Sequence, residues 1–278
     1  MEKSAGVYQT EKDFIPYEVG RFVYLPNHNP IGFLIKLAPE ALETHGILER
    51  ITHVFASRNI SILHFKMSRP VPGKPLYMLL FADVWNSNLI STLSEEIKEI
   101  KYVDRVNVIE PLFKGFTTDK FFFPLIMAGN RVIILRKPLY EGLIKRLRRE
   151  LGSGYEAILY YMGVEMGREA FKDYVKMIGG DLNKLIIVVE EFFRLVGFGV
   201  IRIVDVELGR RCTVRVFDSF ECELFIGLNE YSSHLIRGIL AGWFAEASNV
   251  SDISRVRATE IKCIARGDPY CEVVITIT

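Results

Sequence analysis

Two thiols and a carboxylate lie close together in the last nineteen residues of the chain. Glu260 precedes Cys263 by three positions, and Cys271 follows a turn sequence, Arg-Gly-Asp-Pro, at residues 266–269. The flanking residues favour β-strands, so a tight turn brings the two thiols together. Thiolate and carboxylate groups are ligand types that suit zinc. We therefore expect a zinc site in this hairpin, and a structural one, because no open coordination position is apparent.

Two other interpretations of the same thiols stay open. Free cysteine packs as a small hydrophobe in protein interiors, and two neighbouring cysteines can form a disulfide. Residues 1–14 are polar and charged and lack the apolar core of a signal peptide, so nothing indicates secretion. A disulfide is disfavoured for that reason. Buried packing without an ion fits the residues as well as zinc does.

The pattern E-x2-C-x7-C, with Gly-Asp in the turn, resembles the end of the 4-vinyl-reductase domain. That family is a small-molecule-binding module with a fold like that of TRAPP trafficking subunits, and it includes phenol-responsive sensor domains of bacterial activators. In those sensors the Glu and both Cys bind zinc together with a fourth Cys upstream. Alignment on Gly238 and Gly242 places Ser233 at that fourth position. Serine is a poor zinc ligand, so we take the next residue, His234, as its substitute.

The resemblance covers residues 120–278, which implies a TRAPP-like mixed α/β domain. A Tyr-rich helix with Gly163 and Gly167, followed by Arg-Glu, is typical of the family. Two glycines four residues apart leave bare backbone on one helix face, so that another element can approach closely. The elements expected in this domain are a hairpin (121–126 and 131–135), helices (139–151, 155–178, 182–195 and 235–247), a second hairpin (200–207 and 213–217) and the C-terminal strands (259–264 and 273–277).

Residues 25–112 show a second pattern, the βαββαβ order of ferredoxin-like domains. The expected strands and helices alternate as 31–37, 46–57 (helix), 60–67, 76–84, 88–100 (helix) and 103–109. This part resembles an ACT regulatory domain, with Gly46 where that family has a Gly at the end of its first loop. ACT domains pair and bind amino acids or other small molecules there. The sequence thus predicts an α+β protein with an arm (1–24), an ACT-like domain (25–112), a linker (113–120) and a 4-vinyl-reductase-like ligand-binding domain (121–278).

Aromatic residues are numerous, with 19 Phe and 12 Tyr, which suits an apolar ligand cavity or a subunit interface. Ordinary core packing is the alternative for each of them. Phenol-sensing members hold the phenol hydroxyl with a buried His and Trp, whereas here Phe217 lies near the expected Trp. A more apolar or lipid-like ligand is therefore expected. The residues expected to bind it are Tyr160, Tyr161, Phe192, Phe198, Phe217 and Trp243.

Composition excludes several other functions. The formal net charge of +1 gives no support for nucleic acid or an anionic membrane as main partner. The most apolar stretch, residues 185–203, is interrupted by four charged residues and does not predict a membrane span. Neither a Ser-His arrangement nor a phosphate-binding loop nor a dinucleotide fingerprint is present. The basic face of helix 139–151, formed by Lys145, Arg146, Arg148 and Arg149, is expected to be solvated.

The function expected from these features is a non-catalytic, cytoplasmic sensor. A hydrophobic ligand binds in the C-terminal domain, the ACT-like domain transmits or receives a second signal, and the chain forms a homodimer. Each ligand must favour one of two global states for such coupling. No helix-turn-helix or ATPase segment is present, so output passes through a partner protein. The alternatives are a scaffolding module of TRAPP type and an accessory factor or reductase in tetrapyrrole or aromatic metabolism.

Overall fold

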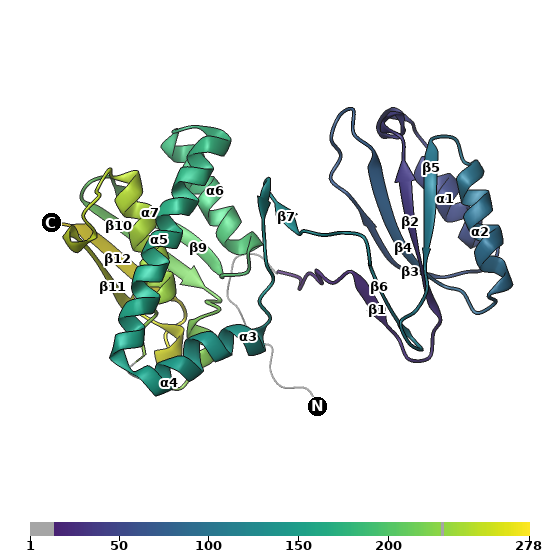
Figure 1. Ribbon diagram of the computed structural model, residues 1–278. Helices are drawn as coiled ribbons and strands as arrows, with labels where there is room; N and C mark the ends of the chain where they lie inside the picture. Colours follow the sequence, from purple (N-terminus) through teal and green to yellow (C-terminus); the bar gives the residue numbers. More distant parts are fainter. Residues whose placement is uncertain (1–13, 229–230) are drawn as a thin grey trace. The chain divides into compact units, whose positions relative to one another are not determined.

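In the computed structural model the described residues form two compact units, residues 15–133 and residues 134–278, the latter together with Phe14 (Figure 1). The structure describes residues 14–228 and 231–278. Both units combine helices with β-sheet, so the protein is α+β as predicted. Within the described ranges, no helix has the length and apolarity needed to cross a membrane.

The first unit contains a four-stranded antiparallel sheet with strand order β3-β4-β2-β5. The predicted βαββαβ order is present, and both helices lie on one face of the sheet (Figure 1). Its elements are β2 (Pro30–Leu37), α1 (Ile47–Ala56), β3 (Ile62–Met67), β4 (Leu76–Asp83), α2 (Asn88–Glu99) and β5 (Val103–Ile109). The two central strands, β2 and β4, are buried along almost their whole length, which explains their continuous apolar sequence.

The second face of this sheet carries a smaller apolar cluster that includes Val23 and Ile109. Val23 belongs to β1 (Phe22–Tyr24), which pairs with β6 (Phe116–Thr118) in a separate two-stranded sheet. The segment predicted as a linker thus contains a paired strand and lies inside the first unit. The hairpin predicted over 121–135 is much shorter, with β7 (Ile126–Met127) and β8 (Asn130–Arg131).

The second unit is built on a four-stranded antiparallel sheet with strand order β11-β12-β10-β9. The helix predicted over 139–151 is divided by a π-turn at Gly142–Arg146, whereas the helix predicted over 235–247 has those bounds. The elements are α3 (Lys137–Glu141), α4 (Leu147–Leu151), α5 (Ser153–Ile178), α6 (Leu182–Leu195), β9 (Val200–Glu207), β10 (Arg211–Phe217), the 3-10 turn η3 (Cys222–Phe225), α7 (Leu235–Ala247), β11 (Val256–Lys262) and β12 (Cys271–Ile277).

Helices α5 and α7 meet backbone to backbone through four glycines. A Cβ added at Gly167 would lie 2.0 Å from the carbonyl oxygen of Ile239, and one at Gly163 would lie 2.3 Å from that of Leu235. The contact is reciprocal, because a Cβ at Gly238 or Gly242 would lie 2.1 or 2.0 Å from carbonyl oxygens of α5. Glycine is required at this crossing, as its spacing in the sequence predicted. The crossing fixes the position of the N-terminal end of α7.

Candidate metal centre and the neighbouring hollow

Four potential metal ligands converge at one end of the second unit. Sulfur atoms of Cys222, Cys263 and Cys271 and a carboxylate oxygen of Glu260 all lie within 4.8 Å of one another. Cys222 begins η3, just after β10, whereas the other three come from β11, the turn after it and the start of β12. Residues Val216 and Cys271 are register partners in the β10–β12 pair. This pairing places the end of β10 beside the C-terminal hairpin.

The spacing of these atoms fits a tetrahedral ion. The Cys263 and Cys271 sulfurs are 3.8 Å apart, and the Cys222 sulfur is 3.9 Å from Oε1 of Glu260. Ligand atoms about 2.3 Å from a tetrahedral zinc ion are about 3.8 Å from one another. All four cysteines of the chain are free and buried. The structure therefore does not support the disulfide interpretation, and the arrangement has more donor groups than simple packing of two thiols requires.

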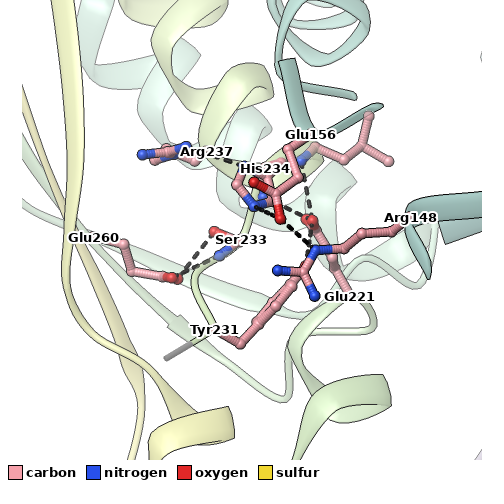
Figure 2. Close-up of polar contacts among 9 residues, drawn as sticks. Arg148, Glu156, Glu221, Tyr231, Ser233, His234, Arg237 and Glu260 are labelled. Atoms are coloured by element: carbon pink, nitrogen blue, oxygen red, sulfur yellow. Dashed lines mark hydrogen bonds and ion pairs between the residues drawn. The ribbon is translucent and has the colours of Figure 1, made fainter. Parts of the chain in front are cut away.

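The fourth predicted ligand was wrong. His234 does not join the cluster: its Nδ1 lies 3.2 Å from a terminal nitrogen of Arg237, and its Nε2 lies 3.6 Å from Glu156. Cys222 holds the position that we assigned to His234. Ser233, which aligned with the fourth family Cys, instead donates to Glu260 twice, from its backbone N–H at 2.7 Å and its hydroxyl at 2.9 Å (Figure 2). It orients the carboxylate as an outer-shell group does.

The protonation behaviour of the cluster also favours a bound cation. Hydrogen bonds from the neighbouring thiols, and to a smaller extent the charge of Arg266, lower the pKa of Cys263 to about 3. The hydrogen bond to Cys263 raises the pKa of Cys222, and burial raises the pKa of Glu260 to about 7. Without an ion these groups must share protons, since few of them can be charged together. A divalent cation removes that conflict and favours the ionised forms.

Arg266 provides a further sign of charge at the centre. Its Nε and one terminal nitrogen are buried and have no hydrogen-bond partner among the described residues. Buried donors are rarely left unpaired, because the loss of hydration costs free energy. Thiolate sulfurs bound to a metal accept hydrogen bonds and carry negative charge. Thiolates of a Cys3Glu centre would suit this neighbouring guanidinium, whose charge helps to lower the pKa of Cys263.

A second buried carboxylate, Glu221, precedes Cys222 directly. Its oxygens accept hydrogen bonds from the backbone N–H groups of residues 234–236 at 2.7–3.1 Å and from the Tyr231 hydroxyl at 2.9 Å. The N–H groups at a helix start have no partner within the helix, and they favour negative charge. Glu221 therefore anchors the start of α7. The segment 231–236 is held by Glu221 and, through Ser233, by Glu260 (Figure 2).

The basic face of α4 borders a hollow of about 400 Å³. Its lining combines six charged residues with Gly152, Phe225 and Leu228; the charged ones are Glu141, Lys145, Arg146, Arg148, Arg149 and Glu156. The guanidinium of Arg148 lies over the stacked rings of Phe225 and Tyr231, 5.4 and 5.1 Å from their centroids. Lys145, Arg146 and Arg149 are exposed, as expected of a solvated face, and together with the partly buried Arg148 they border this recess.

The six aromatic residues predicted to bind the ligand do not gather around one hollow. Tyr161 is 57% exposed and lines an apolar recess of about 620 Å³ on α5. Trp243 is buried against Phe171, and its indole N–H has no partner among the described residues. The others pack with different neighbours: Tyr160 under Arg237, Phe192 against Tyr174, Phe198 against Phe193 and Phe220, and Phe217 against Tyr270.

Sequence reasoning missed Cys222, Glu221 and Arg148. Cys222 was visible as one of four cysteines, in a segment resembling the strand-end motif of the 4-vinyl-reductase family. Its connection to the C-terminal hairpin depends on the pairing of β10 with β12, more than fifty residues apart. Arg148 lies on the predicted basic face, but no pattern indicated that Phe225 and Tyr231 would lie beneath it.

No family model matches the chain. An uncharacterized protein of Methanocaldococcus jannaschii is 28% identical over 126 residues, which cover 45% of this chain and 67% of that protein. The phenol-responsive sensory domain of the transcription activator PoxR, solved with phenol, is 17% identical with a TM-score of 0.49, covering 57% of this chain and 84% of that domain.

Two further solved structures resemble separate parts of the chain. A vinyl-4-reductase family protein of Methanocaldococcus jannaschii is 18% identical with a TM-score of 0.37, covering 53% of this chain and 84% of the other. The ACT domain of a GTP pyrophosphokinase from Chlorobium tepidum is 17% identical with a TM-score of 0.25, and the match covers 30% of this chain and 99% of that domain. Both families named from sequence motifs are thus among the structural neighbours, each with partial coverage.

Proposed function

We propose that the protein is a non-catalytic sensor that binds a hydrophobic small molecule in residues 134–278 and is stabilised by a structural zinc ion. The observation that carries this proposal is the convergence of Cys222, Glu260, Cys263 and Cys271 in a buried site. Four protein ligands complete a tetrahedral shell and leave no position for substrate. The zinc ion therefore supplies folding energy and a rigid end to the domain rather than chemistry.

The metal centre positions parts of the domain that lie beyond its ligands. Cys222 is adjacent to Glu221, which holds the first N–H groups of α7, and Glu260 holds Ser233, two residues before α7. Zinc binding would thus tie the start of α7 to the C-terminal hairpin. Helix α7 crosses α5 at the glycine contact, so the same ion indirectly sets the position of α5. A ligand that binds on α5 would then meet a helix whose position is already fixed.

The apolar recess on α5 is the proposed site of the hydrophobic ligand. Its lining consists of Ala157, Ile158, Tyr161, Met162 and Met166 with one charged neighbour, Glu165. All six of these residues belong to α5, so the recess is an open apolar face of one helix on which a ligand would lie. Methionine and tyrosine side chains adapt to irregular apolar ligands. In this proposal, the ACT-like unit pairs chains and communicates the signal to a partner protein.

Native mass spectrometry of the purified full chain tests the sensor proposal. The expected spectrum shows one zinc ion and a co-purifying lipid or other apolar molecule per chain. Met162→Glu places a carboxylate in the recess, so it should remove the apolar molecule and retain the zinc. Ile187→Glu, at an exposed position on α6 outside the recess, serves as the control and should retain both. Equal ligand retention in both variants would contradict the assigned site.

A scaffolding role is the second candidate, and the same helix favours it. Ile158, Tyr161 and Met162 are each more than half exposed and lie on neighbouring turns of α5. Such a cluster of apolar side chains also suits contact with a second polypeptide. In native mass spectrometry a ligand-free dimer that Met162→Glu dissociates would support scaffolding over sensing. A bound tetrapyrrole would support the role in tetrapyrrole metabolism.

A further inference from the structure

The hollow beside α4 carries an excess of positive charge. Four cationic side chains line it, Lys145, Arg146, Arg148 and Arg149, against two carboxylates, Glu141 and Glu156. Like charges gathered around one recess repel each other, and this repulsion destabilises the folded state unless an anion compensates it. The chain as a whole has a formal net charge of only +1, so the excess is local.

Arg148 is fixed in the orientation that an anion-binding guanidinium requires. Its Nε donates to Oε1 of Glu156 at 2.5 Å, and its plane lies over Phe225 and Tyr231. The two terminal nitrogens have no acceptor among the described residues, and Figure 2 shows them extending past the Glu156 contact beside Tyr231. A guanidinium presents paired N–H groups that match the two oxygens of a carboxylate or phosphate. Because Arg148 is already ordered, the binding of an anion to it costs little side-chain entropy.

The other cations around the recess are weakly paired. Nζ of Lys145 lies 3.8 Å from Glu141, and Arg149 lies 3.5 Å from Glu150 with both side chains mostly exposed. Arg146 forms no ion pair with another described residue. Exposed pairs of this kind contribute little to stability, so their cations are available to a ligand.

The remaining lining restricts the kind of anion. Leu228 is half exposed and provides an apolar wall, whereas Phe225 is buried beneath Arg148. The volume of about 400 Å³ suits a small organic molecule better than a bare inorganic ion. We propose that this hollow binds a small organic anion, with its carboxylate or phosphate held by Arg148 and its apolar body against Leu228. This second ligand site lies outside both the metal centre and the apolar recess on α5. It goes beyond the proposed sensor function and does not depend on it.

Isothermal titration calorimetry with the full chain at constant ionic strength tests this site. The probes are benzoate, phenyl phosphate, inorganic phosphate and, as a neutral match in shape, benzyl alcohol. We expect benzoate or phenyl phosphate to bind at least tenfold more tightly than benzyl alcohol, and the tighter of the two identifies the anionic group. Phenyl phosphate should also exceed inorganic phosphate. Equal binding of benzyl alcohol and the tighter of the two aromatic anions would overturn the role of charge, and equal binding of both phosphates would overturn the apolar wall.

Two variants assign the binding to these residues. Arg148→Gln should weaken binding of the better probe at least tenfold, and Arg146→Gln, at an exposed position, should weaken it about threefold through lost charge. Arg210→Gln removes an exposed arginine at the β9–β10 turn and should leave binding unchanged. If Arg148→Gln fails to fold, the affinities of Arg146→Gln and Arg210→Gln for the probe can still be compared, and this comparison tests the site. Equal affinity in all soluble variants, or no anion binding at millimolar concentration, would overturn the proposal.

Discussion

Buried polar side chains distinguish the two units of this protein. Among the described residues of the first unit, Ser94 and Thr117 are the buried polar ones, and packing of apolar side chains on both faces of its sheet holds the unit together. The second unit buries three carboxylates, Glu221, Glu260 and Glu272. An unpaired buried carboxylate costs several kcal/mol, so each needs a specific compensating partner.

The partners of these three carboxylates differ in how well they compensate the buried charge. Glu272 pairs with Arg215 at 2.7 Å, and Glu221 accepts the first N–H groups of α7. Among the described residues, Glu260 accepts hydrogen bonds from the backbone N–H and hydroxyl of Ser233 and a long one from the Cys222 thiol, and it lies among the three thiols of the cluster. The comparison teaches that apolar packing dominates the first unit, whereas the second gathers buried carboxylates and thiols at one end, where we propose that an ion completes the structure.

Removal of zinc should produce the largest difference between the two units. Zinc binding to sites of this kind contributes on the order of 10 kcal/mol to folding. A strong chelator should therefore unfold residues 134–278, because the buried carboxylate and thiols lose their common partner. The measurement is hydrogen exchange by mass spectrometry, in which β10–β12 should lose protection while β2–β5 keep theirs. Unchanged protection in both units would contradict the claim that the second unit depends on zinc.

Substitution at the helix crossing should have the next largest effect. In Gly167→Ala the new methyl would overlap the carbonyl of Ile239, so α5 and α7 must separate. We expect the free energy of unfolding of the second unit to fall by about 3 kcal/mol. Gly154→Ala, on the same helix with open space around it, should instead stabilise by about 0.5–1 kcal/mol. Urea denaturation measures both, and a similar effect of the two variants would contradict the backbone contact.

Ser233→Ala should weaken zinc binding without abolishing it. The hydroxyl that orients Glu260 is lost, but the backbone N–H of residue 233 still donates to the other carboxylate oxygen. Outer-shell groups of this kind contribute roughly 10–100-fold to metal affinity, and we expect the lower end of that range. Competition with a chromophoric chelator gives the affinity. Ser232→Ala, at the neighbouring position, should match the unsubstituted protein; an equal loss in both variants would argue against the outer-shell role.

Acid should destabilise the second unit modestly through His234. Burial, opposed by Glu156 and reinforced by Arg237 and Arg148, lowers the pKa of His234 to about 4 from 6.5. The unfolded chain then binds more protons between these two values, so stability is full above pH 6.5 and falls as the pH drops towards 4. We expect the free energy of unfolding at pH 5 to be about 1 kcal/mol lower than above pH 6.5, after allowance for solvent screening. His234→Gln should flatten this part of the urea-midpoint profile, and an identical slope in both proteins would refute it.

Local patterns predicted much of the fold and three of the four residues of the candidate metal centre, Glu260, Cys263 and Cys271. The helix expected at residues 235–247, which bears Gly238 and Gly242, has the bounds of α7, and the C-terminal turn brings Cys263 and Cys271 together as expected. The glycine spacing predicted the close helix contact. Each of these features depends on residues within one or two turns of chain, where propensity and side-chain period decide the outcome.

The remaining features depend on long-range pairing. Cys222 reaches the cluster because β10 lies beside β12, and no local pattern distinguishes this neighbour from others. The π-turn at Gly142–Arg146 interrupts a helix whose apolar period continues through it. The aromatic residues predicted to surround one ligand share a residue type but pack against different neighbours. Residue type alone does not decide burial, so Tyr161 is exposed and Trp243 is buried.

The most direct test of the metal centre counts zinc in two cysteine variants of the full chain. Cys222 and Cys212 are both free, completely buried and outside the C-terminal hairpin, but only Cys222 belongs to the cluster. Inductively coupled plasma mass spectrometry should find one zinc ion per chain in the unsubstituted protein and in Cys212→Ala, and a large loss in Cys222→Ala. Absence of zinc from the unsubstituted protein after expression with zinc, or equal zinc content in the two variants, would contradict the account.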